Sequence, residues 1–286
     1  SGRHKGLPRH MACHAHMPVL SGSSFALKRS CARFQPPATR HLLESILLTS
    51  RGFTMEKLGA FTLVLHSHLP YARQAGRWPH GEEWLHEAAA ETYVPLLDAL
   101  YALYAEGTRA RLTLTLTPIL VEQLADEDVR ANFEAYLEEK IEAASSDVPR
   151  FEKEDKPQFA FLAGYYRDWY RRLLSSFRDR YGGNLVSAFR ALQDRGVIEI
   201  VTCAATHGYL PLLVRDESIH LQLRTAVESY RRHFGRPPRS IWLPECAYRP
   251  AYLSDDGRER PGIEAFLARH QIGLFFTETH MIEGGR

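Results

Sequence analysis

A glutamate at the tip of a short apolar segment is the most direct candidate for chemistry in this sequence. Residues 240–243 are mostly apolar and lie between Pro238 and Pro244. Because proline donates no ladder hydrogen bond, the predicted strand ends at Pro244 and delivers Glu245 at its tip. A carboxylate beside aromatic rings such as Trp242 is typical of carbohydrate chemistry, which needs a nucleophile or an acid and flat faces for sugar rings. This segment alone is equally compatible with a solvated turn glutamate.

Three histidines follow predicted strands in the same way. His66 and His68 come directly after apolar residues 60–65, and His207 follows the apolar residues 197–201. Side chains two residues apart in extended chain point to the same side, so His66 and His68 are expected to share one face. Such histidines can line a polar substrate site or bind a metal ion. The alternative for His66 and His68 is that one is capped by a local hydrogen bond and the other is solvated.

A loop between residues 76 and 84 carries two tryptophans, Trp78 and Trp84. An exposed tryptophan beside a strand tip is suited to stacking on a sugar ring. Packing under the loop explains the same residues equally well.

Five apolar segments alternate with segments of helical periodicity. The predicted strands are residues 60–65, 112–117, 197–201, 240–243 and 272–277. Each connection is long enough for a parallel crossover, so the sequence predicts an α/β fold with a parallel sheet. All the polar candidates lie at the C-terminal ends of strands, where active sites form in parallel barrels. Five strands do not close an ordinary barrel, which predicts an incomplete one.

The segments between the strands give further structural expectations. Residues 60–65 form a nearly continuous apolar run, which predicts a strand buried on both faces. Residues 85–103 repeat at helical spacing, with a kink expected at Pro95. Residues 145–157 are charged and rich in turn formers, which predicts a surface loop. The aromatic positions between residues 159 and 177 predict a long helix that contributes to the core.

Composition excludes several classes of function. The 286 residues carry a net charge of +2, with 44% hydrophobic and 24% charged residues, as in ordinary globular proteins. No basic stripe indicates a nucleic-acid partner, and no apolar run is long enough for a membrane span. The four cysteines show no CxxC spacing, which favours a reducing compartment and a cytoplasmic location.

The first part of the chain differs from the rest. Residues 1–54 hold eight Lys and Arg residues against the single acid Glu44 and show no sustained periodicity. Three interpretations compete: a targeting segment, a disordered tail, or residues upstream of a natural start at Met55. The sequence therefore predicts two parts: a disordered or non-native extension over residues 1–54, and the N-terminal part of a catalytic barrel over residues 55–286.

Several of these segments together resemble glycoside hydrolase family 57. The resemblance rests on collinear motifs, which are LHSHLPY at residues 65–71, WPHGEEW at 78–84, GVIEIVTCAATHGY at 196–209 and IWLPE at 241–245. Within the family these motifs are most similar to those of the 1,4-alpha-glucan branching enzymes. The resemblance extends from about Gly59 to the C-terminus and does not include the first 54 residues.

The resemblance implies a fold, a substrate and a set of roles. The fold would be a parallel (β/α)7-type barrel truncated after about five strands, acting on an α-1,4-glucan without a metal or other cofactor. Glu245 would be the nucleophile that forms a covalent glucosyl-enzyme intermediate. His66, His68, Trp78 and His207 would line the donor subsites. In branching, a glucan 6-hydroxyl rather than water takes the chain from the intermediate.

One departure from the family pattern concerns the general acid. In the family this group is an aspartate in a later motif, which no segment of this sequence matches. Asp255, Asp256 and Glu278 are acidic residues near the C-terminal strands, but none has a matching context. Retaining hydrolysis needs two carboxyl groups about 5–5.5 Å apart. We therefore expect the chain by itself to be an inactive fragment of a branching enzyme.

Two other functions remain open at this point. One is a metal-dependent carbohydrate deacetylase or mannosidase on a related barrel, with His66, His68 and His207 as ligands. Such sites usually add an aspartate ligand, which the predicted strand ends do not offer. The other is a non-catalytic remnant that binds glucan through its aromatic residues.

Overall fold

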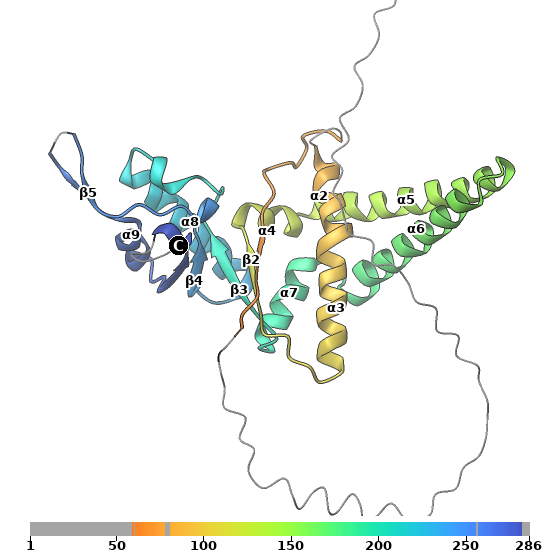
Figure 1. Cartoon of the computed structure of the whole chain (residues 1–286), viewed down its shortest axis with the longest axis horizontal. Coiled ribbons are helices and arrows are strands. Elements are labelled where there is room, and N and C mark those ends of the chain that lie inside the picture. The colour runs from red at the N-terminus through yellow and green to blue at the C-terminus, as the bar shows by residue number, and fades with distance from the viewer. Residues whose placement is uncertain (1–58, 60, 78–80, 256, 282–286) are drawn as a thin grey trace, which may run out of the picture. The chain divides into compact units, whose positions relative to one another are not determined.

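The sheet at the centre of the fold consists of five strands that all run in the same direction. The computed structural model describes residues 59, 61–77, 81–255 and 257–281. Neighbouring strands pair in parallel in the order β1-β2-β3-β4-β7 (Figure 1). They are β1 (Val64–Ser67), β2 (Leu112–Leu116), β3 (Ile198–Cys203), β4 (Ser240–Trp242) and β7 (Leu274–Phe276). The predicted parallel α/β fold of an incomplete barrel is confirmed.

Helices connect the strands. They are α2 (Glu82–Ala88), α3 (Val94–Ala105), α4 (Pro118–Ala125), α5 (Glu127–Lys153), α6 (Pro157–Ser175), α7 (Leu185–Asp194), α8 (Asp216–Phe234) and α9 (Ile263–Arg269). A separate antiparallel pair, β5 (Tyr252–Leu253) and β6 (Glu259–Arg260), follows β4. Local sequence explains several boundaries: Asn184 accepts a hydrogen bond from the amide of Ser187 at the start of α7, and Gly235 closes α8 in the left-handed conformation.

The expected irregularity at Pro95 takes the form of a π-helical segment. Residues Ala89–Tyr93 adopt this wider helix between α2 and α3, and Pro95 lies in the first turn of α3. The wider π turn accommodates the proline ring and the missing backbone donor of Pro95, so the chain continues as one helical run from α2 into α3.

Two groups of buried apolar side chains hold the elements together. The first joins β2 and β3 to helices that precede, connect and follow them, with Leu97, Leu114 and Phe189 fully buried. The second joins β4 to α8 and α9 through residues such as Leu223 and Phe266. Burying each of these side chains contributes about 1.5–3 kcal/mol relative to exposure. The two groups fix the strands whose ends carry the candidate site.

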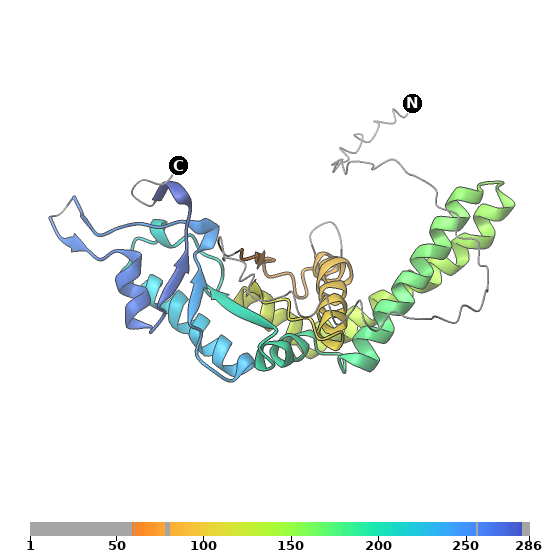
Figure 2. The same cartoon turned by 60° about the horizontal axis from the view of Figure 1, so that its bottom comes forward.

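The prediction of a surface loop over residues 145–157 is wrong for most of that range. Helix α5 continues to Lys153 and contains Pro149, and α6 begins at Pro157 after a short turn. Figures 1 and 2 show α5 and α6 running side by side as an antiparallel hairpin. Contacts between helices stabilise α5 across the proline, including the rings of Phe151 and Phe159, whose centroids lie 5.4 Å apart. The sequence there is charged because much of the helix surface faces solvent.

The prediction of a core helix between residues 159 and 177 is only partly correct. Leu173 and Phe177 are buried, as expected. Nearer the start of α6, Phe159, Phe161 and Tyr165 are exposed, with 72% of Phe161 accessible. Helical periodicity shows which residues share a face, but it does not show whether another element covers that face.

Strand β1 also departs from its prediction. The regular strand begins at Val64 rather than Ala60, and Phe61 and Leu63 are exposed. Since β1 lies at the edge of the described sheet, only one neighbouring strand pairs with it. The prediction of a strand buried on both faces is therefore wrong for β1.

Candidate active site

The four candidate side chains that the structure describes lie together at the C-terminal ends of β1, β3 and β4. The Nε2 atoms of His66 and His207 are 3.2 Å apart, and the rings of His68 and His207 stack with centroids 3.9 Å apart. The Nδ1 atom of His207 lies 3.8 Å from Oε1 of Glu245. His207 is therefore the central member of the cluster, in contact with the other three residues.

Parallel pairing explains why these side chains meet. His66 is level with Thr115 of β2, Cys203 of β3 is level with Trp242 of β4, and each strand then ends within a few residues. Because neighbouring parallel strands end at the same edge of the sheet, residues distant in sequence are delivered to one place. His68 is fixed further by β2, since its Nδ1 lies 3.3 Å from the hydroxyl of Thr117.

A buried glutamine fastens the loop that follows β1. The Oε1 atom of Gln123 accepts hydrogen bonds from the backbone amides of Ala72, at 2.7 Å, and Arg73, at 3.3 Å. Its Nε2 group donates to the carbonyl oxygens of Pro70 and Ile119. The Gln123 amide thus pairs backbone groups of the loop that have no partner in the sheet.

A second glutamine, Gln222 of α8, has the same function for the loop that precedes His207. Its Oε1 atom accepts a hydrogen bond from the amide of Thr206, its Nε2 group donates to the Thr206 hydroxyl, and its carbonyl accepts from the amide of Ala205. These contacts hold the two residues before His207, whose own backbone is left-handed with a φ of 58°. Sequence analysis missed both glutamines, because nothing in their local pattern distinguishes them from other helical glutamines.

All three histidines favour the neutral state. Burial, and then the neighbouring His207, lowers the pKa of His66 to about 4. Burial, His207 and His66 lower the pKa of His68 to about 4, although Glu245 opposes this. Burial also lowers the pKa of His207, again against Glu245. Desolvation and mutual repulsion of the protonated rings therefore outweigh the one nearby carboxylate.

Neutral rings fix how the protons are shared. A hydrogen bond between the Nε2 atoms of His66 and His207 requires one N–H group and one lone pair. The carboxylate near Nδ1 of His207 favours a proton on that nitrogen, so His207 accepts at Nε2 and His66 donates. In this assignment His66 donates to His207, and the Nδ1–H of His207 faces the Glu245 carboxylate at 3.8 Å, which is beyond hydrogen-bonding distance.

The stacking geometry disfavours a shared metal ion. The rings of His68 and His207 lie within 11° of parallel, and imidazole lone pairs lie in the ring plane. Lone pairs in two stacked planes do not converge on one ion, as ligands of a tetrahedral site must. Among the described residues, no group of three or more His, Cys, Asp or Glu side chains has an arrangement that could hold a metal.

Comparison with known proteins identifies the family to which this site belongs. The model of glycosyl hydrolase family 57 matches residues 62–283. The chain belongs to glycosyl hydrolase family 57. It is 43% identical over 231 residues to the 1,4-alpha-glucan branching enzyme of Thermococcus kodakarensis, covering 79% of this chain and 33% of that protein. It is 34% identical over 212 residues to a probable 1,4-alpha-glucan branching enzyme of Mycobacterium tuberculosis, covering 69% of this chain and 39% of that protein.

Solved structures of the family share the fold. A family 57 branching enzyme from Pyrococcus horikoshii superposes with a TM-score of 0.69 at 48% identity, over 78% of this chain and 42% of that one. The alpha-amylase AmyC from Thermotoga maritima gives 0.65 at 35% identity, over 77% of this chain and 39% of that one. The chain therefore spans less than half the length of each of these relatives.

Two aromatic residues adjoin the histidine cluster. The ring of Trp242 stacks on His66 with centroids 4.8 Å apart, and on its other side it packs against Phe276 of β7 at 5.6 Å. Sequence analysis placed Trp242 near Glu245 but did not include it among the binding residues. Its position three residues before the glutamate, on the same strand, was the available signal. The stack explains how His66 loses hydration although its edge is exposed.

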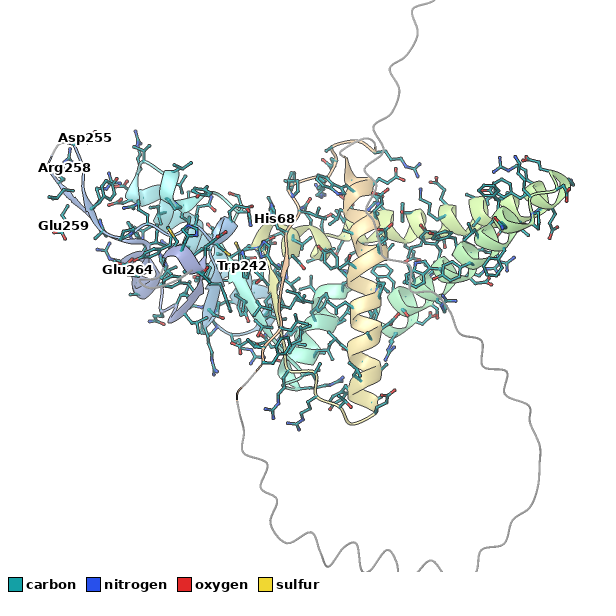
Figure 3. All side chains as sticks on the ribbon, in the orientation of Figure 1. His68, Trp242, Asp255, Arg258, Glu259 and Glu264 are labelled. Carbon is teal, nitrogen blue, oxygen red and sulfur yellow. The ribbon has the colours of Figure 1, made fainter. Side chains whose placement is uncertain are left out.

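The remaining candidates fall outside this cluster. Trp78 and Asp256 are not among the described residues. Asp255 lies on the β5–β6 hairpin, well away from His68 and Trp242 (Figure 3). Glu278 follows β7, where its carboxylate, after burial, contributes to raising the pKa of the Cys246 thiol. Its Oε2 atom lies 3.3 Å from Nδ1 of His280. Within the described chain, Glu245 is thus the carboxylate that contacts the histidines.

Proposed function

We propose that this chain carries the nucleophile half of the active site of a retaining α-glucan-active enzyme, whose reaction is 1,4-alpha-glucan branching. The observation that carries the proposal is the exposed carboxylate of Glu245 at the end of β4, 3.8 Å from a cluster of neutral histidines. The branching activity named for the relatives from Thermococcus kodakarensis and Mycobacterium tuberculosis supports the choice of reaction.

The proposed chemistry proceeds in two displacements. One oxygen of Glu245 attacks the anomeric carbon of a bound α-1,4-glucan, and the bond from that carbon to the leaving glucan oxygen breaks. The leaving oxygen takes a proton from a general acid, which the family resemblance assigns to an aspartate in a later motif. The 6-hydroxyl of an acceptor glucan then attacks the anomeric carbon of the glucosyl ester and gives its proton to the conjugate base of that acid, and the Glu245 carboxylate departs.

The neighbouring groups have binding roles in this proposal. Neutral histidines both donate and accept hydrogen bonds, which matches the mixed character of sugar hydroxyls. The indole of Trp242, stacked between His66 and Phe276, holds the His66 ring in place at the same strand end. None of these steps requires a cofactor. The partner is therefore an α-1,4-glucan, and the process is synthesis of a glycogen- or starch-type polymer.

A reducing cytoplasmic location fits this role. Cys203 and Cys246 are both free thiols, although they lie near the ends of adjacent strands. Within the part of the chain that the structure describes, none of the helices combines the length and the apolar character that a membrane crossing requires.

A trapping experiment tests the nucleophile without depending on the general acid. In 5-fluoro-α-glucosyl fluoride the leaving group is fluoride, which departs without protonation, and the ring fluorine slows hydrolysis of the resulting ester. After incubation of the 286-residue chain, mass spectrometry should find one glucosyl adduct, on the peptide that contains Glu245. The Glu245→Gln variant should remain unlabelled, because its amide is nearly isosteric but is not a nucleophile.

Two other outcomes separate the alternatives. An adduct on a different carboxylate would show that the nucleophile is misassigned. No adduct, combined with retention of the chain on an amylose resin, would favour a non-catalytic glucan-binding protein.

A further inference from the structure

The turn that carries Glu245 has an unusual backbone. Glu245 and Cys246 are consecutive residues with φ values of 55° and 54°, in the left-handed region that glycine favours. Each non-glycine residue there is disfavoured, because its Cβ approaches the neighbouring carbonyl oxygen. Two in succession persist only where surrounding contacts hold them, and such strain concentrates at functional sites.

The carboxylate itself does little to hold the turn. The Glu245 side chain is 72% exposed, and its closest described ionic partner is His207, at 3.8 Å. The position of the carboxylate is therefore set by the backbone beneath it. A small tilt of the turn would move the carboxylate relative to the histidines, and with them relative to a bound sugar.

Hydrogen bonds within the turn close it but do not attach it to the sheet. The amide of Cys246 donates to the carbonyl of Leu243 at 2.7 Å, and the amide of Ala247 donates to that of Pro244 at 3.1 Å. All four residues belong to one local segment. These bonds select the tight conformation, but the segment could still pivot about the end of β4.

A side chain that follows the neighbouring strand ties the left-handed turn itself to the sheet, beside the stacking of Tyr248 on Phe275 two residues further on. Thr277 follows β7 directly, in parallel register with β4, where Trp242 is level with Phe276. Its hydroxyl donates a hydrogen bond of 2.8 Å to the carbonyl oxygen of Cys246. This bond joins the second left-handed residue to the next strand of the sheet.

We infer that Thr277 is a positioning residue, whose hydroxyl holds the left-handed turn at Glu245 and Cys246 and thereby places the Glu245 carboxylate. It acts through the Cys246 carbonyl and does not itself touch the substrate. That Thr277 holds the turn follows from the geometry alone, whereas its effect on catalysis rests on the proposed role of Glu245 as the nucleophile.

The substitution Thr277→Val tests the inference, because valine keeps the branched shape and loses only the hydroxyl. Hydrogen exchange of the Cys246 and Ala247 amides should become about tenfold faster, since these bonds open when the turn loosens. Labelling by 5-fluoro-α-glucosyl fluoride should become roughly 10- to 100-fold slower at saturation, with little change in the half-saturating concentration. Thr277→Ser, which restores the hydroxyl, should recover both properties.

Controls separate positioning from general damage. Thr108→Val removes an exposed threonine that precedes β2, at the opposite end of the parallel sheet from the turn, and should change neither property. The melting temperature of Thr277→Val should stay within a few degrees of the parent, so that the exchange measurement reports on the turn. Unchanged exchange in Thr277→Val, or exchange that Thr277→Ser does not restore, would overturn the inference. Faster exchange without Glu245 labelling of the parent chain would instead refute the proposed nucleophile.

Discussion

The two glutamines that fasten the site loops provide a matched test of how burial controls the cost of losing a hydrogen bond. Gln123 is 1% exposed and contacts the backbone of the loop after β1 through both ends of its amide. Gln222 makes similar contacts to Thr206, but at a solvent-exposed position. Replacing each by leucine removes the polar amide and changes side-chain volume little.

The expected magnitudes follow from which groups lose their partners. In Gln123→Leu the amide of Ala72 and the carbonyl of Pro70 lose their partners in a buried or half-buried setting. An unsatisfied buried group costs about 1–3 kcal/mol, and leucine recovers part of this through apolar burial, so we expect a loss of about 2–4 kcal/mol. In Gln222→Leu water can reach the freed groups, and the expected loss is under about 1 kcal/mol.

The assay is urea-induced unfolding of the 286-residue chain at pH 7, followed by far-ultraviolet circular dichroism. Both variants should keep the parent slope of free energy against urea, so that the shift in midpoint reports stability. Equal losses in the two variants, or a loss below 1 kcal/mol for Gln123→Leu, would show that burial does not set the cost.

Three further predictions follow from the described residues. The pKa values of His66 and His68 are lowered from 6.5 to about 4 in the folded chain. Between pH 6.5 and 4, the unfolded chain therefore binds protons at these two histidines that the folded chain does not bind. Stability should therefore fall between pH 6.5 and 4, by about 1 kcal/mol per histidine after allowance for solvent screening, and His66→Gln should flatten this dependence in urea unfolding. Gly164→Ala, in the interior of α6 with open space around it, should stabilise the chain by about 0.5–1 kcal/mol. Gly235→Ala should instead destabilise it by about 1 kcal/mol or more, because Gly235 is left-handed and a Cβ there would meet Arg190, and thermal denaturation measures both changes.

Sequence patterns predicted the succession of strands and helices along the chain, because the ends of these elements depend on local signals. Pro118 and Pro244 mark the ends of β2 and β4, and Gly235 marks the end of α8. The path of α5 through Pro149 was not predictable in this way. The tendency of a proline to break a helix is overcome only where packing stabilises the helix on both sides of it. Here the packing partner is α6, which lies further along the chain.

The site was predicted as a set of residues but not as an arrangement. The strand-end position of His66, His207 and Glu245 followed from hydrophobic patterns and parallel topology. Their hydrogen-bond order and the left-handed turn at Glu245 did not. Left-handed backbone is usually signalled by glycine, and here a glutamate and a cysteine occupy it, so the local sequence predicts a different conformation.

The neutral state of the histidines bears directly on the proposed nucleophile. A protonated His207 would form an ion pair with Glu245, and the carboxylate would have to break that pair before attacking an anomeric carbon. Packing of His66 against Trp242, and of His68 against His207, removes hydration from the rings and keeps them uncharged. The cluster can then donate and accept hydrogen bonds around a sugar while the Glu245 side chain stays exposed and free of a charged partner among these histidines. Polar groups that bind without neutralising the nucleophile are what a retaining reaction requires at this strand end.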